Sequence, residues 1–141
     1  MRVKSELYLL TALLAAGTLG AAPAPDAPAG GRVFELRTYT AAPGKLDALN
    51  ARFRDHTIAI FKKHGMEVVG FWEPVDKEAG AGEKLVYMLA HASRAAAEAS
   101  WKAFREDPEW VKVKADSEVN GALTTKIESV YLAGTGYSPL R

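Results

Sequence analysis

The chain has 141 residues, of which 48% are hydrophobic and 25% charged, with a formal net charge of +1 and no cysteine. This length and composition suit one globular domain with a single core, and the balanced charge gives no reason to expect a nucleic-acid partner. The lack of cysteine excludes disulfides, thiolate metal sites and cysteine nucleophiles.

Residues 1–22 have the order of a secretory signal peptide. Arg2 and Lys4 precede an apolar run over residues 7–16, and small residues follow it. The run is short for a transmembrane helix, which needs about 20 apolar residues, and the alternative is an uncleaved membrane anchor. We expect residues 23–31, rich in Pro, Ala and Gly, to be a disordered linker. The sequence therefore predicts a periplasmic or secreted protein with no stable membrane insertion after cleavage.

The segment 32–40 alternates strongly and is rich in strand-forming residues, so it predicts the first strand of the domain. Successive side chains of a strand point to opposite faces of the sheet. One face would carry Phe34, Leu36 and Thr38, and the other would carry Glu35, Arg37 and Tyr39. We expect the face with Glu35, Arg37 and Tyr39 to be the one that no helix covers.

An amphipathic helix is expected from about residue 45 to residue 64, and Gly65 provides its stop. Its apolar stripe at helical spacing comprises Leu46, Leu49, Phe53, Thr57 and Ile60. A second strand is expected over residues 66–73. A polar loop with two glycines then leads to a third strand over residues 84–91, which favours antiparallel pairing of these two strands.

The second half of the chain predicts a helix in two pieces and a last strand. Ser93 is a suitable N-cap for a helix over residues 94–106, and Asp107 followed by Pro108 restarts the helix. The last strand is expected over residues 123–132.

The complete order is β-α-β-β-α-β, which indicates an α+β, ferredoxin-like split βαβ fold with helices on one face of an antiparallel sheet. We expect residues 32–134 to form this domain and residues 135–141 to form an irregular tail. A second subunit would cover the open face of the sheet, so the sequence predicts a homodimer.

Several spaced motifs resemble those of the NIPSNAP family. They are Phe34-Glu35-Leu36-Arg37-Thr38-Tyr39, Pro43-Gly44-Lys45, His64-Gly65, Gly70-Phe71-Trp72, Trp101-Lys102-Ala103-Phe104, Asp107-Pro108-Glu109-Trp110 and Glu128-Ser129-Val130-Tyr131-Leu132. The resemblance covers residues 33–133 and implies a dimeric α/β-barrel, in which two ferredoxin-like subunits join their sheets. Relatives in that superfamily include cofactor-independent monooxygenases, haem-handling enzymes and small-molecule-binding proteins. The resemblance carries over no catalytic residue.

His56 is the candidate catalytic residue. It lies three residues after Phe53, at the flank of the apolar stripe, where an imidazole could point between helix and sheet. There it could act as a general base or bind a metal or haem iron. The alternative is a structural histidine bonded to the backbone. The three histidines of the chain have no HxH or HExxH spacing, so we predict neither a metal site nor a cofactor.

The candidate ligand-binding residues are Arg37, Tyr39, Trp72, His91 and Trp101. Arg37 could bind an anionic or carbonyl group, or could form a salt bridge with Glu35. His91 could line the same cavity mouth as Tyr39, or could hold the turn between strand and helix. Trp72 and Trp101 could line a pocket for an aromatic ligand, or could be ordinary core residues.

Three functions fit these observations. The first is an exported homodimer that binds a small apolar or aromatic molecule between helices and sheet without turning it over. The alternative is a cofactor-independent monooxygenase or isomerase, with His56 as general base and Tyr39 or Arg37 polarising a carbonyl. The third is an interaction module without a ligand. Apolar lining with few groups of catalytic type favours the first.

Overall fold

The computed structural model describes residues 32–141, so the predicted leader (1–22) and linker (23–31) lie outside the described part of the chain. The four strands are β1 (Val33–Ala41), β2 (Glu67–Trp72), β3 (Lys84–His91) and β4 (Thr124–Ala133). They form one antiparallel sheet in the order β2-β3-β1-β4. The helices are α1 (Leu46–Arg52), α2 (Ile58–Lys63), α3 (Arg94–Glu106) and α4 (Pro108–Ser117).

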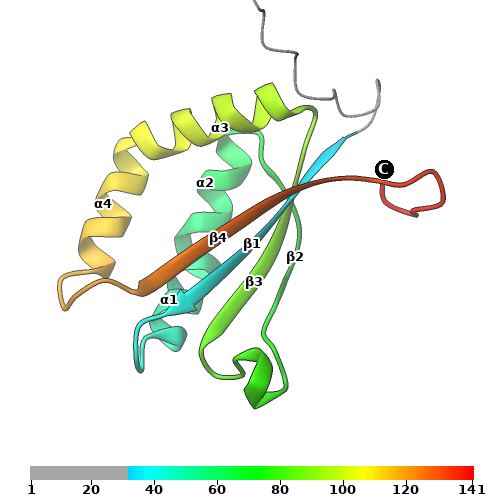
Figure 1. The fold of residues 1–141 in the computed structure, drawn as a ribbon. Helices are drawn as coiled ribbons and strands as arrows, with labels where there is room; N and C mark the ends of the chain where they lie inside the picture. Colours follow the sequence, from blue (N-terminus) through cyan, green and yellow to red (C-terminus); the bar gives the residue numbers. More distant parts are fainter. Residues whose placement is uncertain (1–31) are drawn as a thin grey trace, which may run out of the picture.

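The helices lie on one side of the sheet (Figure 1). This arrangement confirms the predicted α+β, ferredoxin-like split βαβ fold. Within residues 32–141, none of the helices is long and apolar enough to cross a membrane. After β4 the chain continues as turns, with the amide of Ser138 bonded to the carbonyl of Thr135.

The first predicted helix is present but is not regular. A single π-helical turn (Phe53–Thr57) separates α1 from α2. The side-chain hydroxyl of Thr57 donates a hydrogen bond to the carbonyl of Arg52 across this turn, at 3.2 Å. Gly65 follows the helix with a φ of +72°, a left-handed conformation that glycine adopts without steric penalty, as predicted for a helix stop.

The core lies between the sheet and the helices. The predicted stripe of the first helix is buried there in full, and aromatic rings from strands and helices meet around it. Phe53 and Phe61 contact Tyr87 of β3, and Phe61 also contacts Trp101 of α3. The two later helices begin as predicted. Ser93 accepts a hydrogen bond from the amide of Ala96, and Asp107 accepts one from the amide of Glu109.

The expectation about which sheet face is covered is wrong. Glu35, Arg37 and Tyr39 point toward the helices, where Glu35 bonds to Trp101 of α3 and Tyr39 packs against Phe53. Alternation along a strand separates two faces, but each face of β1 mixes polar and apolar residues, so the pattern does not show which face the helices cover. Because Glu35 and Arg37 are enclosed, their charges need partners inside the protein.

The uncovered face of the sheet carries an apolar surface. Register pairs Leu36 of β1 with Met88 of β3 and Val130 of β4, and it pairs Trp72 of β2 with Val86 of β3. Val130 is 53% exposed and Trp72 is 51% exposed. We call this set the open-face surface: Leu36, Trp72, Val86, Met88, Val130 and Leu132.

Candidate ligand-binding site

A cavity of about 580 Å³ lies between the inner face of the sheet and helices α3 and α4. Its lining consists of Arg37, Tyr39, Trp101, Phe104, Arg105, Trp110, Val111, Lys114, Ala115 and Glu118. The volume falls in the range typical of small-molecule sites, and the mixture of aromatic rings with a few polar groups is also typical. The sequence pointed to Arg37, Tyr39 and Trp101, and the structure brings these three together.

The split of the second helix creates this space. Asp107 and Pro108 end α3 and start α4 in a new direction, so that the two helices form an angle above the sheet (Figure 1). Trp101 and Phe104 project from α3, and Trp110 projects from α4 and lies 4.6 Å from Phe104, measured between ring centroids. The resulting wall is aromatic on two sides.

Arg37 forms part of the floor of the cavity. Its guanidinium carbon lies 4.3 Å from the ring centroid of Trp101, which is the distance of a cation–π contact. Its Nη1 donates to the carboxylate of Glu35 at 2.6 Å. The salt bridge with Glu35, one of the two alternatives for Arg37, is therefore present, and the residue also lines the cavity.

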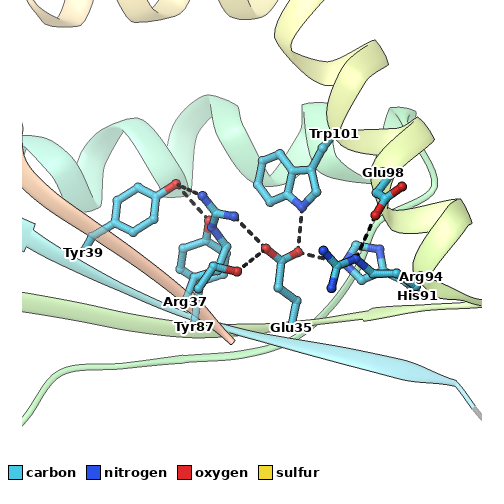
Figure 2. Close-up of polar contacts among 9 residues, drawn as sticks. Glu35, Arg37, Tyr39, Tyr87, His91, Arg94, Glu98 and Trp101 are labelled. Carbon is cyan, nitrogen blue, oxygen red and sulfur yellow. Dashed lines mark hydrogen bonds and ion pairs between the residues drawn. The ribbon is translucent and has the colours of Figure 1, made fainter. Parts of the chain in front are cut away.

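Glu35 is the centre of a buried polar network, which we call the Glu35 network. It accepts hydrogen bonds from Arg37 Nη1, Trp101 Nε1 at 2.6 Å and Ser129 Oγ at 2.7 Å. His91 Nε2 lies 3.1 Å from Glu35 Oε2. Figure 2 shows Glu35 rising from β1 toward Trp101, with Arg37 on one side and His91 on the other. Strands and helix α3 are thereby joined through one carboxylate.

The network keeps this carboxylate charged. Burial alone would raise the pKa of Glu35, but hydrogen bonds from His91, Trp101, Ser129 and Arg37 outweigh burial and lower the pKa to about 2. A carboxylate with such a low pKa is a weak base at neutral pH. Glu35 therefore fits a positioning role for Arg37 and Trp101 and does not fit the role of a general base.

The hydroxyl of Tyr39, a residue that lines the cavity, is held by two neighbouring side chains. Tyr87 is fully buried, and its hydroxyl lies 3.1 Å from the hydroxyl oxygen of Tyr39, which gives the Tyr87 proton its acceptor. Arg37 Nη2 also approaches the Tyr39 oxygen, at 3.4 Å. A phenol oxygen that accepts these bonds still has its own proton to donate.

His91 does not line the cavity, contrary to the first of its two predicted roles. It is 3% exposed and lies behind Glu35, where its ring also faces Tyr131 at 6.4 Å between centroids. Its Nδ1 atom is buried and has no hydrogen-bond partner within residues 32–141.

Trp72 is also not part of the cavity. It lies on the open face of the sheet, opposite Trp101, and its ring covers the backbone of Gly70. A Cβ atom at Gly70 would lie 2.8 Å from the Trp72 ring, which explains the glycine. A β-bulge shifts the β2 register between Val68 and Gly70, and Trp72 pairs with Val86 of β3 on the open face.

His56 does not point between helix and sheet. It is exposed, and it lines a groove of about 530 Å³ on the outside of the protein, between the first helix and α4. The reason is the π-helical turn, which takes more residues per turn than an α-helix and rotates His56 further from the buried Phe53.

Within residues 32–141 no group of three His, Cys, Asp or Glu side chains is placed to hold a metal ion.

Sequence reasoning missed part of the cavity wall. Trp110, Phe104, Arg105 and Lys114 line it, but their spacing on α3 and α4 is equally typical of core or surface positions. Only the Asp107-Pro108 break, which sets the angle between the two helices, could have suggested them.

Comparison with known proteins gives a consistent result. The model of the NIPSNAP family matches residues 34–139. A crystal structure of a NIPSNAP family protein with unknown function from Agrobacterium tumefaciens has a TM-score of 0.69 and 22% identity, covering 82% of this chain and 99% of that one. A second NIPSNAP family protein from the same organism has a TM-score of 0.64 and 25% identity, covering 78% and 99%.

The fold extends beyond this family. A protein from Nitrosomonas europaea, proposed to be an antibiotic biosynthesis monooxygenase, has a TM-score of 0.55 and 14% identity, covering 79% of this chain and 96% of that one. At this identity the similarity concerns the fold alone. None of the curated proteins matches the chain.

Proposed function

The chain belongs to the NIPSNAP family, and we propose that it binds a small aromatic molecule in the cavity beneath α3 and α4 without turning it over. The observation that supports this most directly is the cavity itself, with Trp101, Phe104 and Trp110 on its walls. Aromatic walls stack on a planar ligand. The Tyr39 hydroxyl would donate a hydrogen bond to an oxygen of that ligand and fix its orientation.

The composition of the cavity wall favours binding over catalysis. Among its lining residues, Arg37 and Glu118 are already engaged in ion pairs, with Glu35 and Arg52 respectively. None of the histidines in the described range 32–141 lines the cavity. The monooxygenase alternative required His56 beside the ligand, but His56 lies on the outer surface. The shared fold is therefore the remaining support for the monooxygenase alternative. A chain that consumed oxygen with phenolic substrates, and lost this activity in Tyr39→Phe, would restore the alternative.

The replacement Ala115→Trp tests the binding proposal. Ala115 lines the cavity from α4, and an indole at this position would fill much of the space. We expect the fluorescent aromatic amine N-phenyl-1-naphthylamine to gain emission with the natural protein. Its affinity should fall by about tenfold or more in Ala115→Trp, because ligand and indole compete for one volume.

The matched control is Ala99→Trp, at an exposed position of α3 outside the cavity lining. It adds the same indole to the surface and should leave probe affinity unchanged. Equal affinity in the natural protein and both variants would place the probe elsewhere and would contradict the proposal.

We also propose that two copies of the chain pack through the open-face surface. An exposed apolar sheet face of this kind normally has a partner. A second copy of the chain would be such a partner, because two-fold symmetry brings the same surface of each copy together. The two sheets would then stack about 10 Å apart. The dimeric α/β-barrel implied by the family resemblance has this arrangement. The cavity lies on the other side of the sheet and would stay accessible in such a dimer.

Export of the protein is a further proposal. It rests on the charged start, apolar run and small-residue zone of residues 1–22. Expression of the full chain in a Gram-negative bacterium should yield a periplasmic protein whose intact mass lacks this segment. A full-length mass in the cytosolic fraction would contradict export.

A further inference from the structure

The charges around the cavity are not balanced. Its lining carries three cationic side chains, Arg37, Arg105 and Lys114, and one anionic side chain, Glu118. Glu35 neutralises Arg37 from below at 2.6 Å, and Arg52 neutralises Glu118 at 2.9 Å. Arg105 and Lys114 are left as the surplus charges of the cavity wall.

Both surplus cations are available to a ligand. Lys114 lies 3.9 Å from Glu118, whose nearer partner is Arg52, and its side chain is more than half exposed. Arg105 is exposed and forms no ion pair with any residue of the described range 32–141. They project from different helices, Arg105 from α3 and Lys114 from α4, so the same opening has a cation on each of two walls.

We infer that the ligand of this cavity is an organic anion, with its aromatic body between Trp101 and Trp110 and its charged group at the opening between Arg105 and Lys114. This inference rests on the proposed binding function and adds the ligand's charge. An anionic group placed at the opening remains partly hydrated, so it does not lose the large solvation energy that a buried charge would lose. The surplus cations attract it and disfavour cations of the same shape.

A pair of probes separates charge from shape. 1-Anilinonaphthalene-8-sulfonate and N-phenyl-1-naphthylamine share the same aromatic body, and only the first carries a sulfonate. Each is titrated into the natural protein and into Ala115→Trp, and the binding lost in that variant is taken as binding in the cavity. We expect the sulfonate to bind the cavity about tenfold more tightly than the neutral amine, with an affinity that decreases as salt is added.

The double variant Arg105→Gln with Lys114→Gln identifies the origin of this preference. It should remove the preference, so that the ratio of the affinities for the sulfonate and the neutral amine falls from about tenfold to about one. Lys102→Gln is the matched control, because Lys102 is an exposed cation of α3 that pairs with Glu106 outside the cavity. This control should retain the preference.

The outcomes separate the two claims. If both probes bind the cavity with equal affinity, or if the double variant keeps the preference for the sulfonate, the ligand charge is assigned wrongly while the cavity stays a binding site. If neither probe shows any binding that Ala115→Trp removes, the proposed function itself fails and this inference fails with it.

Discussion

Replacement of Glu35 by leucine is expected to lower the free energy of unfolding by about 3 kcal/mol, since removal of the buried partner leaves the charge of the mostly buried Arg37 without compensation. The variant also removes the acceptor of the Trp101 indole N–H and of the Ser129 hydroxyl. Urea denaturation followed by circular dichroism measures this change. A loss below about 1 kcal/mol would mean that the Glu35 network does not hold the sheet and α3 together.

Two further variants make the result specific. Glu98→Gln removes a carboxylate of the exposed Arg94–Glu98 pair on α3, and its effect should stay within about 0.5 kcal/mol. The double variant Glu35→Leu with Arg37→Leu should recover part of the stability lost in Glu35→Leu, because it also removes the uncompensated charge. A double variant no more stable than Glu35→Leu would show that the hydrogen bonds of Trp101 and Ser129 dominate.

The same carboxylate should govern part of the acid sensitivity. Its pKa is about 2 in the folded protein, compared with an ordinary value of 4.5. A lowered pKa in the folded state means that the stabilisation is fully present above the ordinary value and is lost as the pH falls toward 2. Unfolding free energies measured between pH 5 and pH 2, as approximate limits of this window, should fall more steeply for the natural protein than for Glu35→Gln. Parallel profiles would contradict this assignment.

Val130→Glu is expected to convert the proposed dimer to a monomer. Two-fold symmetry would bring a new carboxylate from each copy into an apolar interface, where a buried charge without a partner is strongly unfavourable. Val130 lies on the uncovered face of β4 and is 53% exposed. Sedimentation velocity at micromolar concentration should show a dimer for the natural protein and a monomer for the variant.

The control for this experiment is Val119→Glu. Val119 is an exposed apolar residue after α4, at 75% exposure, and it lies outside the open-face surface. The same charge there should leave the dimer intact. A natural protein that sediments as a monomer, or a Val130→Glu variant that stays dimeric, would exclude packing through this face.

The order of the elements could be predicted from the sequence because each element has a local signal. Residues 94–106 form a helix with its cap at Ser93, and Gly65 ends the first helix, as their positions indicated. The covered side of the sheet could not be predicted in this way. Both faces of β1 carry apolar residues, and only tertiary packing shows that Glu35 is enclosed, at 1% exposure.

The cavity residues were predictable where one strand or helix presents them, and not where several elements converge. The alternation in β1 places Arg37 and Tyr39 on one face of the sheet, but it does not show that the helices cover this face. His56 was placed by assuming regular α-helical geometry, and the π-helical turn rotates it outward. Trp72 was proposed because it is aromatic, and nothing in the sequence indicates the bulge in β2 that precedes it. Periodicity does not reveal irregularities of this kind.

The central claim is that the cavity beneath α3 and α4 binds an aromatic molecule. The most direct measurement is the indole N–H resonances of the three tryptophans in a nitrogen–proton correlation spectrum, recorded while N-phenyl-1-naphthylamine is added. Trp101 and Trp110 line the cavity, and Trp72 lies on the opposite face of the sheet. We predict that the Trp101 and Trp110 resonances shift with saturation while the Trp72 resonance stays in place. A shift of the Trp72 resonance alone, or no shift in any of the three, would contradict the account.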